Sequence, residues 1–117
     1  MIDFTKILNK IEKLTERDLR HKSISDLYLS AGEEFGELGR AIKVEQVVYG
    51  NQHKTLDEPA KSEAVDLLIM AVAIYFATGG SSKKLSKNLQ KKLKKWKKNQ
   101  GKSDAQHFGR SSKKDRK

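Results

Sequence analysis

The sequence contains no cysteine. This absence excludes disulfide bonds, thiolate metal ligands and a cysteine nucleophile. It also fits the reducing environment of the cytosol, and we expect a cytoplasmic protein. Sustained alternation of apolar and polar residues is absent as well, so the sequence argues against a fold built on β-strands.

Long hydrophobic runs are also missing. The longest apolar stretch, Leu67–Ala77, is shorter than the roughly 20 residues that a helix needs to cross a bilayer. Met1–Leu14 alternates apolar and charged residues and does not resemble a signal peptide. We therefore expect no membrane association, and a chain of 117 residues is typical of one domain.

The net charge of +10 is distributed unevenly along the chain. Residues 83–117 hold 15 basic and two acidic residues, whereas residues 1–82 hold 10 basic and 13 acidic residues. A mildly acidic body is thus followed by a strongly basic C-terminal third. This asymmetry is typical of a protein with a polyanion partner: nucleic acid, a membrane surface or a phosphorylated substrate. A solvated helix with a solubilising tail explains it equally well.

Helical spacing of apolar residues recurs along the chain and predicts an all-α fold. Four helices are expected, over residues 4–20, 24–48, 59–77 and 82–99, with a loop at residues 50–54. Residues 101–117 lack periodicity, so we divide the chain into a domain at residues 1–100 and a flexible basic tail at residues 101–117.

Capping residues mark where the expected helices begin and end. Asp3 or Thr5 suits the start of the first helix. Ser23 and Asp26 predict a capping box at the second, and the only proline, Pro59, suits the first turn of the third. The segment from Gly79 to Ser82 separates the third helix from the fourth.

The second and third expected helices have unusual compositions. The third is apolar nearly all round after Asp66, so we expect it to be central and covered on several sides. The second has three glycines, each of which costs a helix about 1 kcal/mol relative to alanine. Close approach of another helix, room for a ligand and local weakness are alternative reasons. Its apolar stripe is expected at Leu27, Ala31, Phe35 (or Glu34), Leu38 and Ile42.

Two pairs of acidic residues have a spacing of three: Glu34 with Glu37, and Glu63 with Asp66. Residues at i and i+3 share a helical face, so two antiparallel helices would bring the four carboxylates together. Without a cation they would repel one another and raise their own pKa values. Mg²⁺ takes carboxylate and water oxygens as ligands. Each pair alone has a simpler explanation. Glu34 and Glu37 could belong to a solvated acidic face, and Glu63 and Asp66 could complement the dipole near a helix N-terminus.

Glu33-Glu34-x-x-Glu37 followed by Glu63-x-x-Asp66 resembles the EExxE…ExxD signature of the MazG-like, all-α nucleoside triphosphate pyrophosphohydrolases. The resemblance covers about residues 24–99 and includes the basic segment Lys91–Trp96. It implies a four-helix MazG-like bundle with a central acidic helical hairpin, completed by oligomerisation. The apolar third helix also favours a core shared with a second chain, and we expect a homodimer or a dimer of dimers.

The resemblance also implies a reaction: Mg²⁺-dependent hydrolysis of a nucleoside or deoxynucleoside triphosphate between the α and β phosphates, giving a monophosphate and pyrophosphate. Glu33 would support the site by holding or deprotonating the attacking water. Lys92 and Lys95 are candidates for neutralising the phosphate tail. The family often has Asn and Arg near this segment, whereas here Lys dominates and lacks the bidentate geometry of Arg. The implied ligands of Mg²⁺, or of Mn²⁺ in its place, are Glu34, Glu37, Glu63 and Asp66.

Two other functions fit parts of the sequence. A nucleic-acid-binding protein would use the lysine-rich fourth helix and the tail, while a purely structural helical oligomer would use only the apolar stripes. The enzyme requires the acids. The nucleic-acid binder requires only the lysines, and its affinity should fall steeply with salt.

Overall fold

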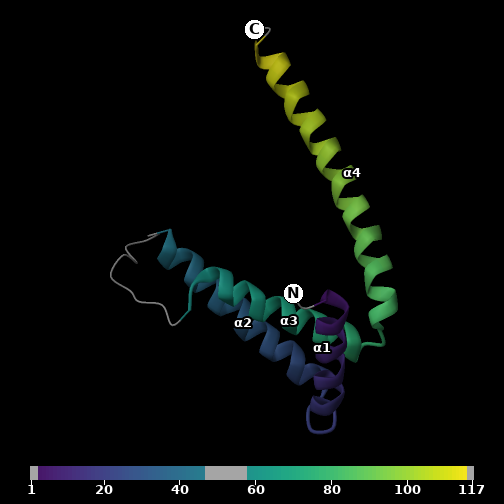
Figure 1. Ribbon diagram of the computed structural model, residues 1–117. Helices are drawn as coiled ribbons and strands as arrows, with labels where there is room; N and C mark the ends of the chain where they lie inside the picture. Colours follow the sequence, from purple (N-terminus) through teal and green to yellow (C-terminus); the bar gives the residue numbers. More distant parts are fainter. Residues whose placement is uncertain (1–2, 47–57, 116–117) are drawn as a thin grey trace. The chain divides into compact units, whose positions relative to one another are not determined.

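The computed structural model describes residues 3–46 and 58–115, with side chains described up to residue 103. No strand occurs in these ranges, and the predicted all-α fold of four helices is confirmed (Figure 1). The chain divides into two compact units, residues 1–82 and residues 83–117. The helices are α1 (Phe4–Asp18), α2 (Ile24–Glu45), α3 (Ala60–Ala77) and α4 (Ser82–Asp115).

Side-chain caps determine where α1 and α2 begin. The Asp3 carboxylate accepts a hydrogen bond from the backbone N–H of Thr5 at 3.1 Å, so Asp3 is the cap of α1. At α2 the predicted capping box is confirmed: the Ser23 hydroxyl oxygen accepts from the Asp26 N–H at 3.1 Å, and the Asp26 carboxylate accepts from the Ser23 N–H at 2.8 Å. The Ser23 N–H stabilises the charged carboxylate and lowers the pKa of Asp26.

The start of α3 is linked to the end of α2. Pro59 is the N-cap of α3, one residue before the helix rather than inside its first turn. Its side chain cannot accept a hydrogen bond, and the Glu45 carboxylate of α2 accepts one from the Ala60 N–H at 2.7 Å instead. This bond satisfies one of the backbone donors that a helix N-terminus leaves open.

Helix α3 ends before Gly79, as predicted, and its end is a Schellman motif. Gly79 has a φ of 102°, and the N–H groups of Gly79 and Gly80 donate to the carbonyl oxygens of Phe76 and Tyr75. A Cβ atom on Gly80 would collide with the Tyr75 ring, so this position needs glycine. Two residues later the Ser82 hydroxyl donates to the Glu12 carboxylate at 2.7 Å, which ties the turn to α1.

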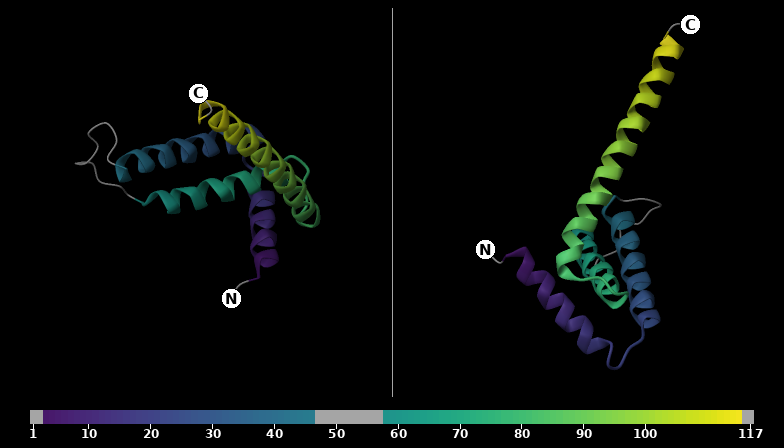
Figure 2. Two further views of the ribbon diagram at one scale, coloured as in Figure 1. Left: turned by 90° about the horizontal axis from the view of Figure 1, so that it is seen from above. Right: turned by 90° about the vertical axis from the view of Figure 1, so that its right-hand side faces the viewer.

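Helices α2 and α3 pack side by side as a hairpin, and α1 packs on α3 (Figure 2). The inward stripe of α2 differs from the one predicted. Phe35 and Ile42 are 67% and 41% exposed, so their assignment to this stripe was wrong. Glu34, the alternative to Phe35 at the same turn, is half-buried and belongs to the stripe. The stripe consists of Leu27, Ala31, Glu34, Leu38 and Ala41, all buried or half-buried.

The two helices that contact α3 do not cover all of its apolar surface. Ala73 is buried, but Val65, Leu68 and Ile69 are 54%, 57% and 44% exposed. Within the first unit, α1 and α2 therefore do not cover this helix on several sides as predicted. The physical reason is its composition: α3 is apolar nearly all round, and two neighbouring helices bury only part of its circumference.

The glycines of α2 do not serve close packing within this chain. A Cβ atom at Gly32, Gly36 or Gly39 would meet no atom within 4 Å. Of the three explanations for these residues, close approach of another helix is therefore not met by the described helices of the first unit, α1 and α3.

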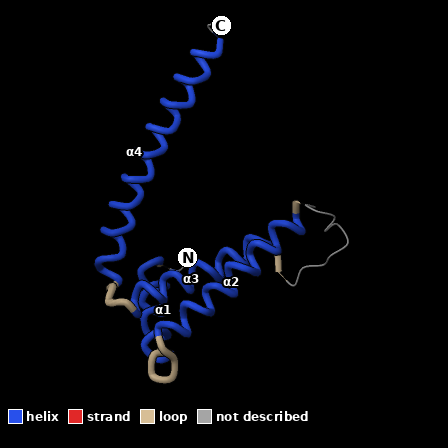
Figure 3. The backbone as a smooth tube through the Cα atoms, turned by 180° about the vertical axis from the view of Figure 1, so that it is seen from behind, coloured by secondary structure: helices blue, strands red, loops and turns tan. Residues whose placement is uncertain are grey.

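Helix α4 is longer than predicted and forms the second unit (Figure 3). It continues past the expected end at residue 99 to Asp115. Gly101 alone costs about 1 kcal/mol, and no proline follows it, so nothing forces the helix to end there. The predicted loop at residues 50–54 and the predicted last residues of the second helix lie outside the described residues.

Within the described ranges, no single helix is both long and apolar enough to cross a membrane. Helix α3 and residues 82–103 reach the required length and hydropathy only when they are counted together.

Candidate metal centre

Five carboxylates gather in the α2–α3 hairpin, and they form two groups of three. In each group the candidate ligand oxygens lie within 4.8 Å of one another. The first triplet is Glu34, Glu37 and Glu63, and the second triplet is Glu58, Glu63 and Asp66. Glu63 belongs to both triplets, so the two groups share one side chain.

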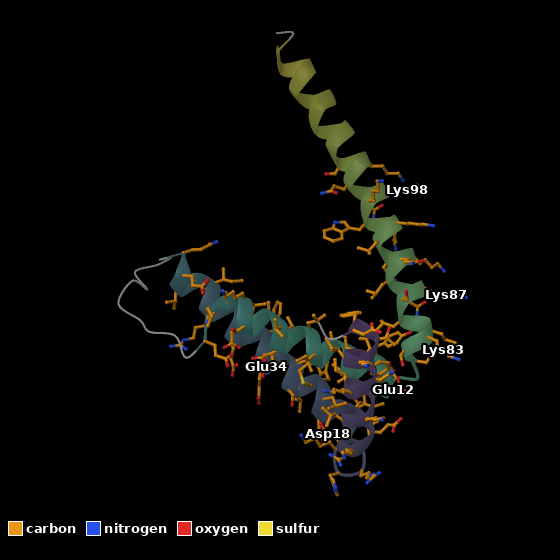
Figure 4. The ribbon with its side chains drawn as sticks, viewed as in Figure 1. Glu12, Asp18, Glu34, Lys83, Lys87 and Lys98 are labelled. Carbon is orange, nitrogen blue, oxygen red and sulfur yellow. The ribbon has the colours of Figure 1, made fainter. Side chains whose placement is uncertain are left out.

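Two acids of the first triplet, Glu34 and Glu63, each have one carboxylate oxygen that is buried and has no hydrogen-bond partner. Glu63 is only 7% exposed, and its Oε2 atom has no hydrogen-bond partner. Glu34 extends from the hairpin (Figure 4), and its Oε2 atom is likewise buried and without a partner. A buried carboxylate is costly unless hydrogen bonds, a proton or a cation compensate its charge.

The electrostatics of the hairpin reflect this cost. Burial first, and then the neighbouring charges of Glu37, Glu58 and Asp66, raise the pKa of Glu63 to about 7. Burial also raises the pKa of Glu34, followed by the charges of Glu37 and Asp66. The cluster therefore holds more negative charge than the chain itself neutralises, and a cation would relieve the repulsion.

The donor set and its dimensions fit a hard divalent cation. Mg²⁺ binds oxygen ligands at about 2.0–2.1 Å in octahedral geometry, so adjacent ligand atoms lie about 3 Å apart and opposite ones about 4.2 Å apart. The oxygens of each triplet already lie within 4.8 Å of one another. Small rotations of the side chains would bring three oxygens to ligand distance around one ion.

The structure brings the four predicted ligands close together, but in a different arrangement from the expected cage. Three of them form the first triplet, whereas Asp66 is grouped with Glu63 and Glu58. Asp66 is only half-buried, and Glu63 is the acid that the core encloses. Sequence reasoning missed Glu58 as a site residue because it precedes α3 and lies five positions from Glu63, outside the helical i, i+3 relation.

The remaining predicted site residues lie elsewhere. Glu33 is exposed on α2 and belongs to neither triplet. Lys92 and Lys95 are exposed on α4, in the second unit. Their roles at the substrate stay predictions.

An open apolar groove of about 350 Å³ lies on the same hairpin. Its lining comes from α2 and α3, and two of its side chains, Tyr28 and Phe35, are 70% and 67% exposed. The other lining residues are Leu29, Ala31, Gly32 and Leu67.

Comparison of the chain with protein-family models, curated proteins and solved structures gives no match. The acidic hairpin and the sequence motif that it contains are therefore the basis for a functional proposal.

Proposed function

We propose that this protein is a Mg²⁺-dependent nucleoside triphosphate pyrophosphohydrolase of the MazG-like type. The observation that carries the proposal is the pair of buried, unpartnered carboxylate oxygens on Glu34 and Glu63, grouped with Glu37. Such oxygens require a cation or a proton. The choice of reaction is supported by the motif Glu33-Glu34-x-x-Glu37…Glu63-x-x-Asp66 in which these acids occur.

The proposed hydrolysis joins the oxygen of water to the α-phosphorus and breaks the bond between that phosphorus and the oxygen bridging to the β-phosphorus. Pyrophosphate leaves with the bridging oxygen, and a proton of the water passes to a base. Bound Mg²⁺ would polarise the phosphate oxygens and offset their charge. Glu34, Glu37, Glu63 and Asp66 would hold it.

The other proposed roles concern water and the leaving group. Glu33, exposed next to Glu34 on α2, would orient the attacking water or accept its proton. Lys92 and Lys95 would compensate the charge that develops on pyrophosphate.

A panel of nucleoside triphosphates, incubated with Mg²⁺ and assayed separately for pyrophosphate and phosphate, tests the reaction. Asp66→Asn and Glu37→Gln should each abolish turnover with an unchanged helical circular dichroism spectrum. Asp18→Asn, a matched change at an exposed acid of α1 (Figure 4), should leave turnover unaltered. Phosphate release without pyrophosphate would contradict cleavage between the α and β phosphates. Full activity of both site variants would refute the metal assignment.

We also propose that a second copy of the chain completes the core. Tyr28, Phe35 and Ile42 of α2 are 70%, 67% and 41% exposed. Gly32 lies between Tyr28 and Phe35, and Gly39 lies between Phe35 and Ile42. Successive members of this series are four or three residues apart, so all five lie on one face of the helix. Glycine between large apolar side chains lets the helix of a second copy approach closely. Exposed apolar surface of this kind marks interaction sites.

Light scattering coupled to size-exclusion chromatography tests the oligomer. The wild-type chain should elute as a dimer or tetramer, and Phe35→Glu should dissociate it. Phe4→Glu is the control, because Phe4 of α1 is 60% exposed and lies outside this face. A monomeric wild-type protein would overturn the proposal.

A second candidate function, binding of nucleic acid through phosphates, is favoured by α4. Its described side chains include ten lysines between residues 83 and 102, all exposed and with no acid among them. Lys83, Lys87 and Lys98 extend from the helix in Figure 4. At 1.5 Å per residue the lysines extend over roughly 29 Å.

Fluorescence anisotropy with a labelled duplex tests this second function. If six to ten phosphates are contacted, affinity should fall by about 10³–10⁵ between 50 and 200 mM salt. Affinity that is independent of salt would exclude it. The two functions are separable, because Asp66→Asn should leave binding of the duplex unaltered.

A further inference from the structure

We propose that one face of α1 binds the phosphate backbone of nucleic acid. All basic residues of this helix lie on that face, and we call them the α1 cationic row: Lys6, Lys10, Lys13 and Arg17. The inference goes beyond the second candidate function, which involves α4 alone. It does not depend on the proposed hydrolysis of nucleotides.

The spacing of the row places it on the outward side of α1. Its members are four, three and four residues apart, which confines them to an arc of about 60° around the helix axis. Leu8 and Thr15 are the buried residues of α1, and they lie roughly half a turn away from this arc. Helix α1 packs on α3, whereas all four side chains of the row are exposed.

The acids of α1 do not neutralise the row. Glu12, Glu16 and Asp18 all lie outside its arc, and Glu12 accepts the hydrogen bond from the Ser82 hydroxyl at 2.7 Å. Among the side chains that the structure describes, no carboxylate forms an ion pair with a member of the row. Positive charge is therefore concentrated on one side of the helix and stays available to a partner.

This arrangement has a cost that a polyanion would remove. Lys6 with Lys10, and Lys13 with Arg17, are like-charged pairs at i, i+4, and such pairs destabilise a helix. Lys6 also lies in the first turn of α1, where the helix dipole disfavours a cation. Phosphate groups beside the row would replace this repulsion with attraction.

The row also has room for a phosphate group. An open hollow of about 320 Å³ is lined by Lys10, Lys13, Leu14 and Arg17. The guanidinium of Arg17 can donate two hydrogen bonds to one phosphate, and the lysines can act as point charges. From Lys6 to Arg17 the row extends over about 16 Å. One strand of a duplex carries a phosphate about every 3.4 Å of its axis, so the row is long enough to meet several.

The surroundings of the row favour nucleic acid over a membrane or an acidic protein. A helix that lies on a membrane inserts its apolar face, but Leu8 and Thr15 of α1 are already buried. Protein interfaces are anchored by buried aromatic side chains, whereas Leu14 is the only apolar residue that lines the hollow. A phosphate backbone needs only cations for binding.

Fluorescence anisotropy with a labelled DNA duplex and the full-length chain, measured between 50 and 200 mM salt, tests the row. Each phosphate contact contributes about −0.9 to the slope of log K against log salt concentration. The triple variant Lys10→Gln, Lys13→Gln, Arg17→Gln should therefore have a slope shallower by about 2.7. Circular dichroism checks its folding. If this variant does not fold, Lys13→Gln alone should make the slope shallower by about 0.9.

A matched control removes the same charge from exposed positions of the first unit outside the row: Lys22→Gln, Lys43→Gln, Lys61→Gln. It should keep the wild-type slope. An equal change of slope in this control would overturn the inference, because net charge alone would then explain binding.

The remaining outcomes separate α1 from α4 and nucleic acid from lipid. A slope that falls in Lys87→Gln, Lys98→Gln but not in the folded row variant would overturn the role of α1 and leave that of α4. A wild-type chain that does not bind the duplex would overturn both. Binding to vesicles of phosphatidylserine and phosphatidylcholine that the row variant loses, without binding to the duplex, would assign the row to a membrane surface and refute the proposal.

Discussion

Replacing Glu63 with Gln should weaken the pH dependence of stability in the metal-free protein. The pKa of Glu63 is about 7 in the folded chain, against an ordinary value of 4.5. As the pH rises from 4.5 to 7, the unfolded chain loses this proton while the folded chain keeps it. Unfolding is therefore increasingly favoured through this window, and the effect is complete above pH 7. Gln carries no titrating proton, so this contribution disappears in the variant.

Bound Mg²⁺ should offset this loss of stability at a pH above about 7, at which Glu63 is ionised. A ligand at 100 times its Kd stabilises the folded state by about 2.7 kcal/mol. For a folded unit of 82 residues this corresponds to a rise in Tm on the order of 10–20 °C. At pH 5 the protonated carboxyl competes with the ion, and the rise should be much smaller.

Thermal unfolding followed by far-ultraviolet circular dichroism, between pH 4.5 and 8.5, measures both effects. Samples with a chelator give the stability of the metal-free protein at each pH, and samples with Mg²⁺ give the increase in stability on binding the ion. Glu16→Gln is the control at an exposed acid of α1. The pKa of Glu34 is also raised, so Glu63→Gln should keep a residual slope of the same sign. An unchanged slope in Glu63→Gln, or a wild-type stability that is constant across the window, would refute the reasoning.

Three further substitutions test the framework of the hairpin by thermal unfolding. Gly80→Ala should destabilise the protein by about 1–3 kcal/mol, because its Cβ would collide with the Tyr75 ring; an unchanged Tm would show that the ring moves aside freely. Gly36→Ala should stabilise it by about 1 kcal/mol, since an added Cβ meets no atom within 4 Å. Glu45→Ala should cost about 1 kcal/mol of stability, because the Ala60 N–H loses its acceptor. An unchanged stability would mean that water accepts the Ala60 hydrogen bond equally well.

Local chemistry explains why the helices could be predicted. The Ser23 and Asp26 capping box and the bonds of Gly79 and Gly80 at the end of α3 join residues at most five positions apart. Such contacts depend on the local sequence alone. Where no strong local signal exists the prediction was less accurate, as at Gly101, which α4 passes through without ending.

The sequence by itself determined that the chain is helical and that Glu34 and Glu37, and Glu63 and Asp66, share helical faces, because these properties follow from spacing along one helix. Only the tertiary structure decided how α2 and α3 are aligned, and therefore which oxygens meet. That alignment buries Glu63 rather than Asp66 and brings Glu58 into the cluster. The physical reason is that helix register depends on packing between two surfaces distant in sequence, which no motif within one helix specifies.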